Sequence, residues 1–343
     1  MSRKTAQRKH DLTADSAQKE LVKLIQSFSY GHHLHTVFSD FVEMSALAIS
    51  NSADRAQFEA REKRYLEIAG KYKREEVERF PQMLGLLIES FEQRVGVIRK
   101  ETAVGLPVSG GLTDVLGETY MMLGLGNDRA GQFFTPYSVS RMMSMMLIGD
   151  VGAEVERRGF LRVHEPACGA GGMVIAAADS ILAAGHNFQQ VMHATCIDID
   201  PCCVHMTYVQ LSLLHIPATI VHGNALSMEV WGTWYTPAHI LGGWTFKLRR
   251  RLEADLLRAT VAAEREPEVE QAGTSPAWSE GPVLAETEPS DLTVLEREPL
   301  QVATPTSTAS RDAMSLADLF EQSLSSGARE RTVFDTIDQL TLF

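Results

Sequence analysis

Apolar residues recur every three or four positions between about residues 15 and 100, and this spacing predicts a helical N-terminal domain. Asp15 and Gln18 stand where a capping box would begin its first helix. We interpret the histidines of GHHLH, residues 31–35, as a helix start or loop rather than a metal site, because no acidic partner stands beside them. The recurring apolar positions are Leu21, Leu24, Ile25, Phe28, Leu34, Val37, Phe38, Phe41, Met83, Leu86, Leu87 and Phe91.

From Leu161 onward, short β-rich runs alternate with alanine-rich helical runs. The order is LRVHEPACGAGG, MVIAAADSILAAG, HATCIDIDP, CCVHMTYVQLSLLHI and ATIVHGNAL. Strand, helix, strand, helix and strand in this succession predict a Rossmann-like α/β fold with a doubly wound parallel sheet.

The composition changes again after about residue 251. Residues 264–310 contain six prolines among many Glu, Ala, Ser and Thr, with too few large apolar residues for a core. We expect an acidic disordered linker over residues 251–312, followed by a short helix and a terminal peptide over 313–343. The two preceding domains are predicted to cover residues 1–125 and 126–250.

The net charge of −12 is concentrated in this tail. Residues 1–250 carry 25 basic and 26 acidic side chains, whereas residues 251–343 carry 7 and 18. A near-neutral body neither supports nor excludes binding to DNA. No apolar run has the length of a membrane span and no signal core is present, so we expect a soluble cytoplasmic protein. The four cysteines have neither disulfide nor zinc-site spacing, which indicates reduced thiols and no metal.

The strongest local signal is EPACGAGG, residues 165–172, between a predicted strand and a predicted helix. Glycines let the backbone turn tightly and approach a ligand, and the following helix offers free N–H groups. The alternative is a purely structural turn. Asp198 ends the next predicted strand, where a carboxylate can accept both hydroxyl hydrogens of a ribose. Asp200 and Pro201 then mark the start of the next helix.

Four segments in this order resemble the adenine-N6 DNA methyltransferases, specifically the modification subunits of type I restriction-modification systems. They are GGLTDVLGETYMMLGLGNDRAGQFFTP, HEPACGAGG, CIDIDP and GNAL, between about Gly110 and Leu226. The resemblance implies a SAM-dependent methyltransferase core, S-adenosylmethionine (SAM) as cofactor, DNA as partner and a separate specificity subunit.

The resemblance also assigns roles to individual residues. Phe134 to Pro136 match the motif that holds the methionine end of SAM, and the loop 165–172 wraps the same end. Asp198 matches the ribose ligand with Ile199 beside the adenine, and Asn224 replaces an aspartate that contacts the adenine amine. The implied cofactor-binding residues are Phe134, Thr135, Pro136, Glu165, Pro166, Cys168, Gly169, Gly171, Asp198, Ile199 and Asn224.

The family's acceptor motif, Asn-Pro-Pro-Phe or a variant, is missing: the sequence contains no Asn-Pro-Pro or Asp-Pro-Pro triplet. Such an enzyme holds an extruded base against a stacking surface beside the methyl donor. Substitute catalytic candidates are Tyr235, His239 and Trp244, and residues 238–244 resemble a strand followed by a glycine turn. Their alternative role is to pack against the sheet. A complete sheet also needs about three more strands, which residues 251–343 do not supply.

The last five residues, QLTLF, resemble the peptide that docks bacterial DNA-processing proteins on the replication sliding clamp. The partner-binding residues would be Gln339, Leu340, Leu342 and Phe343. The alternative is a terminus that folds back on the body. Apolar residues in SLADLFEQSL, residues 315–324, predict a short helix that binds either a partner or the chain itself.

Two functions follow from the sequence. The first is a SAM-dependent DNA adenine-N6 methyltransferase or close relative that acts in DNA modification. The second is a catalytically inactive SAM-binding protein that is recruited to DNA or to the sliding clamp. The two hypotheses differ in whether residues 235–244 form a base pocket that faces the loop at Gly169.

Overall fold

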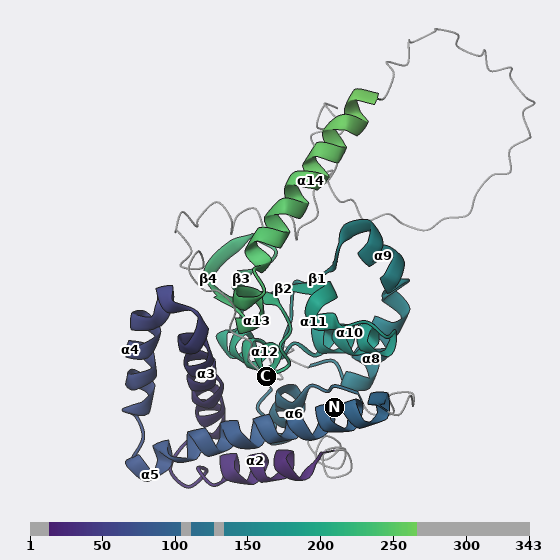
Figure 1. The fold of residues 1–343 in the computed structure, drawn as a ribbon. Coiled ribbons are helices and arrows are strands. Elements are labelled where there is room, and N and C mark those ends of the chain that lie inside the picture. Colours follow the sequence, from purple (N-terminus) through teal and green to yellow (C-terminus); the bar gives the residue numbers. More distant parts are fainter. Residues whose placement is uncertain (1–13, 104–110, 127–133, 266–343) are drawn as a thin grey trace, which may run out of the picture. The chain divides into compact units, whose positions relative to one another are not determined.

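The computed structural model describes residues 14–103, 111–126 and 134–265 (Figure 1). The chain divides into two units, residues 1–254 and 255–343. Of the second unit, the structure describes residues 255–265, which belong to the last helix, α14 (Trp244–Arg265). Residues 251–265, the first part of the predicted disordered linker, are helical as part of α14, so the linker prediction is wrong there: no proline or glycine interrupts this stretch. The rest of the linker, the short helix and the terminal peptide lie outside the described residues. No helix in the described ranges is long and apolar enough to cross a membrane.

The N-terminal part is helical, as the apolar spacing predicts. Asp15 caps the first helix, because its carboxylate accepts a hydrogen bond from the Gln18 N–H at 2.8 Å. The Gln18 side chain points away from this cap and donates to the Val115 carbonyl, so the reciprocal half of the capping box is absent. The helices before the sheet are α2 (Ser16–Gln26), α3 (Leu34–Ala53), the 3-10 turn η1 (Arg55–Gln57), α4 (Phe58–Ala69), α5 (Arg74–Val77), α6 (Arg79–Ala103), α7 (Val115–Leu123), α8 (Tyr137–Leu147) and α9 (Val151–Arg158).

The predicted strand and helix alternation is present. Three parallel strands, β1 (Leu161–Glu165), β2 (Met192–Asp198) and β3 (Ala218–Asn224), lie side by side in chain order. The helices that connect them are α10 (Gly172–Ala183), α11 (Phe188–Val191) and α12 (Pro201–Leu213). A fourth strand, β4 (Glu229–Tyr235), pairs antiparallel with β3 (Figure 1). The fold is therefore mixed α/β with a mostly parallel sheet.

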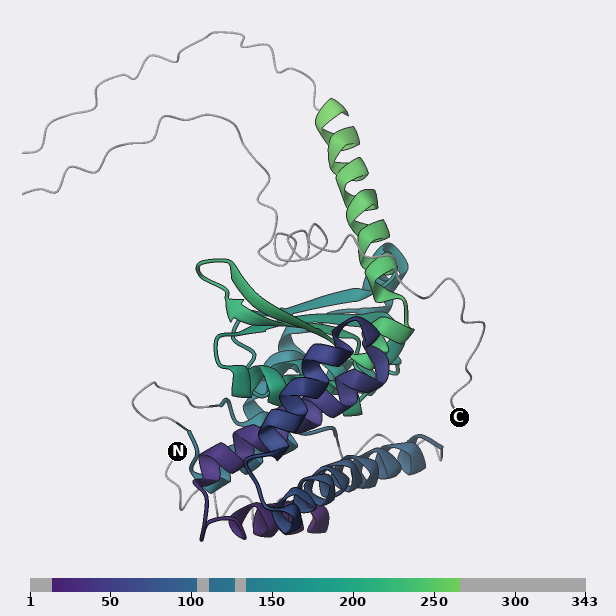
Figure 2. The same cartoon turned by 90° about the vertical axis from the view of Figure 1, so that its left-hand side faces the viewer.

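The two faces of the sheet differ in chemistry. On one face, Ala194, Cys196 and Ile220 join the hydrophobic core that α10 and α12 complete, and Figure 2 shows this helical layer on one side of the sheet. Side chains alternate along a strand, so His193 and Thr195 point to the opposite face. The same core continues into α2, α3, α6 and α7, because these helices contribute its largest apolar side chains.

The three parallel strands follow the order of the first three strands of a doubly wound sheet. In the standard order 3-2-1-4-5-6, further strands continue beyond the first strand. Among the described strands, β1 pairs with β2 alone, and the described residues after β4 form only the helices α13 (Pro237–Leu241) and α14. The expectation of a strand over residues 238–244 is wrong. Thr236 caps a helix there by accepting from the His239 N–H, and Pro237 begins it.

Two buried histidines join α13 to the sheet. His193 of β2 and His239 of α13 share a hydrogen bond of 2.8 Å between Nε2 and Nδ1, and His239 Nε2 lies 3.0 Å from the Thr245 hydroxyl. Burial lowers the pKa of His239 to about 3. Burial, together with electrostatic interactions with His239 and Arg162, also lowers the pKa of His193. Both imidazoles are therefore neutral in the folded protein at neutral pH.

We predict that acid destabilises the fold through this pair. The unfolded chain takes up protons below a pKa near 6.5 while the folded histidines do not, so stability decreases as pH falls from about 6.5 toward 3, by up to about 1.4 kcal/mol per pH unit for each histidine. Urea unfolding of wild type and His239→Gln between pH 7.5 and 4.5 measures this. In a plot of unfolding free energy against pH, His239→Gln should lose roughly half of the slope that the pair contributes. His33→Gln, which replaces an exposed histidine, should keep the wild-type slope. Equal slopes in all three proteins would contradict the assignment.

Candidate cofactor site

The glycine turn that follows β1 has a backbone that only glycine adopts easily. Gly169 and Gly171 have φ of +55° and +88°, in the left-handed region. A Cβ at Gly169 would lie 3.0 Å from the ring of Phe134, and one at Gly171 would lie 3.2 Å from the Thr207 hydroxyl. The turn thus needs glycine for its conformation and for the close approach of its neighbours.

Asp198 ties the end of β2 to this turn. The Gly169 N–H donates to Asp198 Oδ2 at 2.8 Å, and the Asp200 N–H donates to Oδ1 at 2.9 Å. The Cys168 N–H donates to the Ile197 carbonyl at 2.9 Å. The structure therefore brings the two strongest sequence signals together at the carboxyl end of the parallel strands, where open α/β sheets bind ligands.

Side chains of helix α12 hydrogen-bond to the backbone carbonyls of the glycine turn. Thr207 donates through Oγ1 to the Gly169 carbonyl at 2.9 Å, and Gln210 donates through Nε2 to the Ala170 carbonyl at 2.7 Å. The same Gln210 amide donates to Asp114 Oδ1 at 2.7 Å, which fixes the segment that leads into α7. The sequence analysis missed these residues. Their only signal is a spacing of three, which places Thr207 and Gln210 on one helix face.

Phe134 is the residue of the Phe-Thr-Pro motif that reaches the turn. Its ring contacts Gly169 and packs at 5.3 Å from the ring of Tyr120, whose other side packs at 5.3 Å against Phe38. Thr135 is exposed, and Pro136 is the N-cap residue of α8. The helical part thus positions the Phe134 ring through a stack of aromatic side chains.

Two carboxyl groups give the site an acidic character. Burial raises the pKa of Asp198, although the N–H groups of Asp200 and Gly169 stabilise its charged form. Burial also raises the pKa of Glu165, and the nearby charge of Asp198 raises it further. Two partly buried carboxylates that repel each other favour a cationic ligand.

The remaining predicted cofactor residues differ in their exposure and in their contacts. Ile199 is 60% exposed directly after Asp198, and Pro166 is exposed on the turn. Cys168 is buried, and its contact with Cys196 together with burial raises the pKa of its thiol, so the thiol stays protonated. The Asn224 side-chain oxygen accepts from the N–H groups of Leu226 at 2.9 Å and Ser227 at 3.3 Å, and so closes the turn into β4.

The three catalytic candidates lie at the opposite end of the sheet. Tyr235 pairs with Thr219, near the start of β3, and its ring packs at 4.8 Å from that of His239. Trp244 is fully buried against Phe160, which immediately precedes β1. The glycine turn and Asp198 are at the carboxyl ends of these strands, so residues 235–244 form no base pocket that faces Gly169.

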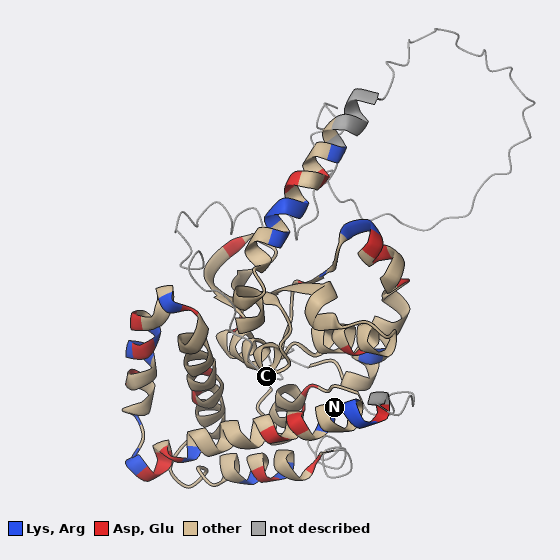
Figure 3. Ribbon diagram, viewed as in Figure 1, with Lys and Arg blue, Asp and Glu red and all other residues tan. Residues whose placement is uncertain are grey.

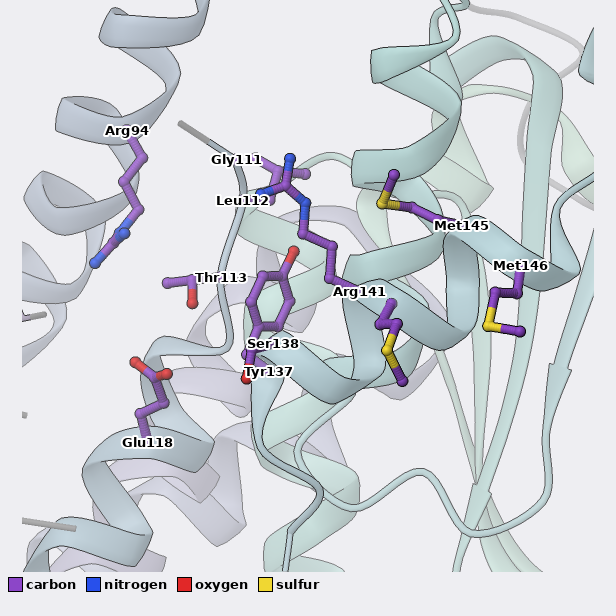
Figure 4. Close-up of a pocket in the computed structure, with 11 residues that line it drawn as sticks. Arg94, Gly111, Leu112, Thr113, Glu118, Tyr137, Ser138, Arg141, Met145 and Met146 are labelled. Carbon is purple, nitrogen blue, oxygen red and sulfur yellow. The ribbon is translucent and has the colours of Figure 1, made fainter. Parts of the chain in front are cut away.

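A separate pocket of about 740 Å³ lies between α6, α7, α8 and the segment at residues 111–113. Figure 4 shows Tyr137 and Arg141 extending from α8 toward Gly111 and Leu112. Arg141 pairs with Asp179 at 3.0 Å, and Asp179 accepts from the Leu112 N–H at 3.0 Å. Neither the glycine turn nor Asp198 is among the described residues that line this pocket.

Charged side chains do not gather into one basic face on the described helices. Figure 3 shows Lys and Arg interspersed with Asp and Glu along α4, α5 and α6. The densest basic run, Lys247, Arg249, Arg250 and the buried Arg251, lies in the first turns of α14. This distribution agrees with the near-neutral charge of residues 1–250.

The class of protein follows from a comparison with known families. Residues 113–241, somewhat more than a third of the chain, match the family model described as N-6 DNA Methylase. The match begins beside the segment that leads into α7 and ends with α13, so it contains the glycine turn, Asp198 and the whole sheet. This segment belongs to the N-6 DNA methylase family. No curated protein and no protein of solved structure matches the chain.

We predict that Gly169→Ala destabilises the fold by more than backbone strain alone. Gly159 is the matched control, because it also has a positive φ, of +84°, while an added Cβ there meets nothing within 4 Å. Gly159→Ala should cost about 1 kcal/mol, and Gly169→Ala about 1–2 kcal/mol more because of the Phe134 ring. Urea unfolding measures both variants. Adding Phe134→Ala should make Gly169→Ala less costly, and equal costs for the two glycines would contradict the close contact.

Proposed function

We propose that this protein binds SAM and acts in DNA adenine-N6 modification. The observation that carries the proposal is the hydrogen bond between the Gly169 N–H and the Asp198 carboxylate at the carboxyl edge of a parallel sheet. It lies within a segment of the N-6 DNA methylase family. The finer assignments below rest on this geometry together with the sequence motifs.

The residues present fit the cofactor. Asp198 Oδ2 accepts the Gly169 N–H, Oδ1 accepts the Asp200 N–H, and the Ile199 N–H also stabilises the carboxylate. At least one of its four lone-pair sites therefore remains to accept from a hydroxyl group of a ribose. Ile199 would lie beside the adenine with Asn224 near its amine, and Phe134 to Pro136 would hold the methionine end with the loop 165–172. SAM supplies an electrophilic methyl group on a cationic sulfonium, whose charge suits the acidic pair Glu165 and Asp198.

A second function is favoured by a specific observation. An N6-adenine enzyme must hold an extruded base beside the methyl donor, and the candidates Tyr235, His239 and Trp244 lie at the other end of the sheet. The sequence also lacks the Asn-Pro-Pro triplet. This favours a protein that binds SAM without transferring the methyl group by itself.

Partners are proposed from the sequence alone. DNA and a separate specificity subunit follow from the resemblance to modification subunits. The replication sliding clamp follows from the terminal peptide at Gln339 to Phe343, which lies outside the described residues. A cytoplasmic location would suit all three partners.

We predict that Asp198→Asn lowers SAM affinity at least tenfold, because the amide oxygen cannot accept a ribose hydroxyl in addition to the N–H groups that the carboxylate accepts. Calorimetry with SAM measures the effect. Asp200→Asn is the matched control, since Asn also caps a helix and should maintain α12. Transfer of labelled methyl to unmethylated duplex DNA, measured with the same proteins, separates the two functions. Label on adenine supports the enzyme, binding without label supports the second function, and absence of SAM binding in the wild type would exclude both.

We also predict that SAM binding weakens in acid. Protonation of Glu165 and Asp198 removes the negative charge that favours the sulfonium, and their raised pKa values move this loss toward neutral pH. Affinity should decrease as pH falls, by at most about tenfold per pH unit for each proton taken up. Calorimetry between pH 8 and 5 measures this, with the uncharged thioether S-adenosylhomocysteine as the comparison ligand. The same pH dependence for both ligands would contradict a role of the sulfonium charge.

A further inference from the structure

The β3–β4 hairpin brings a tryptophan to the edge of the sheet that carries Asp198. Asp198 pairs with His222 on β3, and His222 pairs with Gly232 on β4. These three residues form one row across three strands. Trp231 precedes Gly232 on an antiparallel strand, so it lies at the carboxyl end of β3, on the same edge as Asp198 and Ile199.

A β-bulge at this point sets the direction of Trp231. The pairs His222–Gly232 and Gly223–Val230 leave Trp231 as the extra residue of β4. A Cβ at Gly223 would lie only 2.2 Å from the Glu229 carbonyl oxygen, so glycine is required opposite the bulge. Bulges redirect side chains and are frequent beside binding sites.

Ile199, His222 and Trp231 are in successive contact beside Asp198. His222 donates through Nε2 to the Ile199 carbonyl at 3.3 Å, and its ring centroid lies 5.1 Å from that of Trp231 at an interplanar angle of 80°. Trp231 is 50% exposed, and Ile199 is also exposed. Ile199 and Trp231 therefore present apolar and aromatic surface close to Asp198.

The other two described tryptophans have structural contacts that account for them. Trp234 packs on His205 and Tyr208 of α12, and Arg61 lies 4.2 Å above its ring. Trp244 is 1% exposed. The Trp231 ring packs near-perpendicular to that of His222 and is 50% exposed, so half of a large aromatic surface faces solvent.

We propose that Trp231 and His222 form a wall of the adenine pocket, against which the purine ring of the cofactor packs. This inference rests on the proposed function, because it takes Asp198 as the ribose ligand. An adenine attached to that ribose would lie beside Ile199, and His222 and Trp231 are the next groups along the sheet edge. Stacking on an aromatic ring gives affinity for a flat purine in addition to the hydrogen bonds of the ribose.

The test compares Trp231→Ala and Trp231→Phe with Trp234→Phe in the full-length chain. Calorimetry measures SAM affinity, and tryptophan fluorescence reports whether SAM changes the environment of Trp231. Trp231→Ala should weaken SAM binding roughly tenfold, and Trp231→Phe should restore most of the loss because a ring remains. The fluorescence change should disappear in Trp231→Phe while binding persists, and it should remain in Trp234→Phe.

Three outcomes would overturn the proposal, and they are distinguishable from failure of the proposed function. If Asp198→Asn abolishes SAM binding while Trp231→Ala leaves it unchanged, the cofactor binds but Trp231 is not part of its pocket. If Trp231→Ala weakens binding of a single-stranded oligonucleotide and not of SAM, the ring serves a nucleobase. If wild type binds no SAM, the proposed function fails and this inference fails with it.

Discussion

The hydrogen bond from the Gly169 N–H to the Asp198 carboxylate is the contact on which the rest of the site depends. It joins the turn after β1 to the end of β2, two segments separated by α10 and α11. The left-handed φ of Gly169 aims its N–H, and the ring of Phe134 covers the position where any other residue would carry a Cβ. Thr207 and Gln210 of α12 then hold the carbonyls of the same turn.

The topology of the sheet determines which residues lie beside the glycine turn and Asp198. A doubly wound sheet binds its ligand where the strand order reverses, between its two halves. The described residues form three parallel strands, and β4 extends the sheet as a hairpin beyond β3. The residues available after the hairpin, His239 and Trp244, pack at the amino ends of the strands. In the part of the chain that the structure describes, the candidate catalytic residues therefore lie away from the sheet edge that carries the glycine turn and Asp198.

Features with a local signal can be predicted from the sequence. Asp15 and Asp200 are predictable as helix starts because a cap acts within three residues, and the glycine turn and Asp198 are predictable because they follow strands. Residues 238–244 are not, because their apolar run is typical of a strand whereas Thr236 and Pro237 begin a helix. The bulge at Trp231 and the support from Gln210 depend on pairing between distant segments, which no short window of sequence contains.

Amide hydrogen exchange with and without SAM reports on each segment of the protein without any substitution. SAM should slow exchange at residues 165–172 and 198–200, which form the turn and the end of β2, and at the β3–β4 hairpin. Exchange in α13 should not change, since α13 lies at the other end of the sheet. Protection confined to α13 and residues 235–244, or no protection at the glycine turn at saturating SAM, would show that the cofactor does not bind at the edge that carries Asp198.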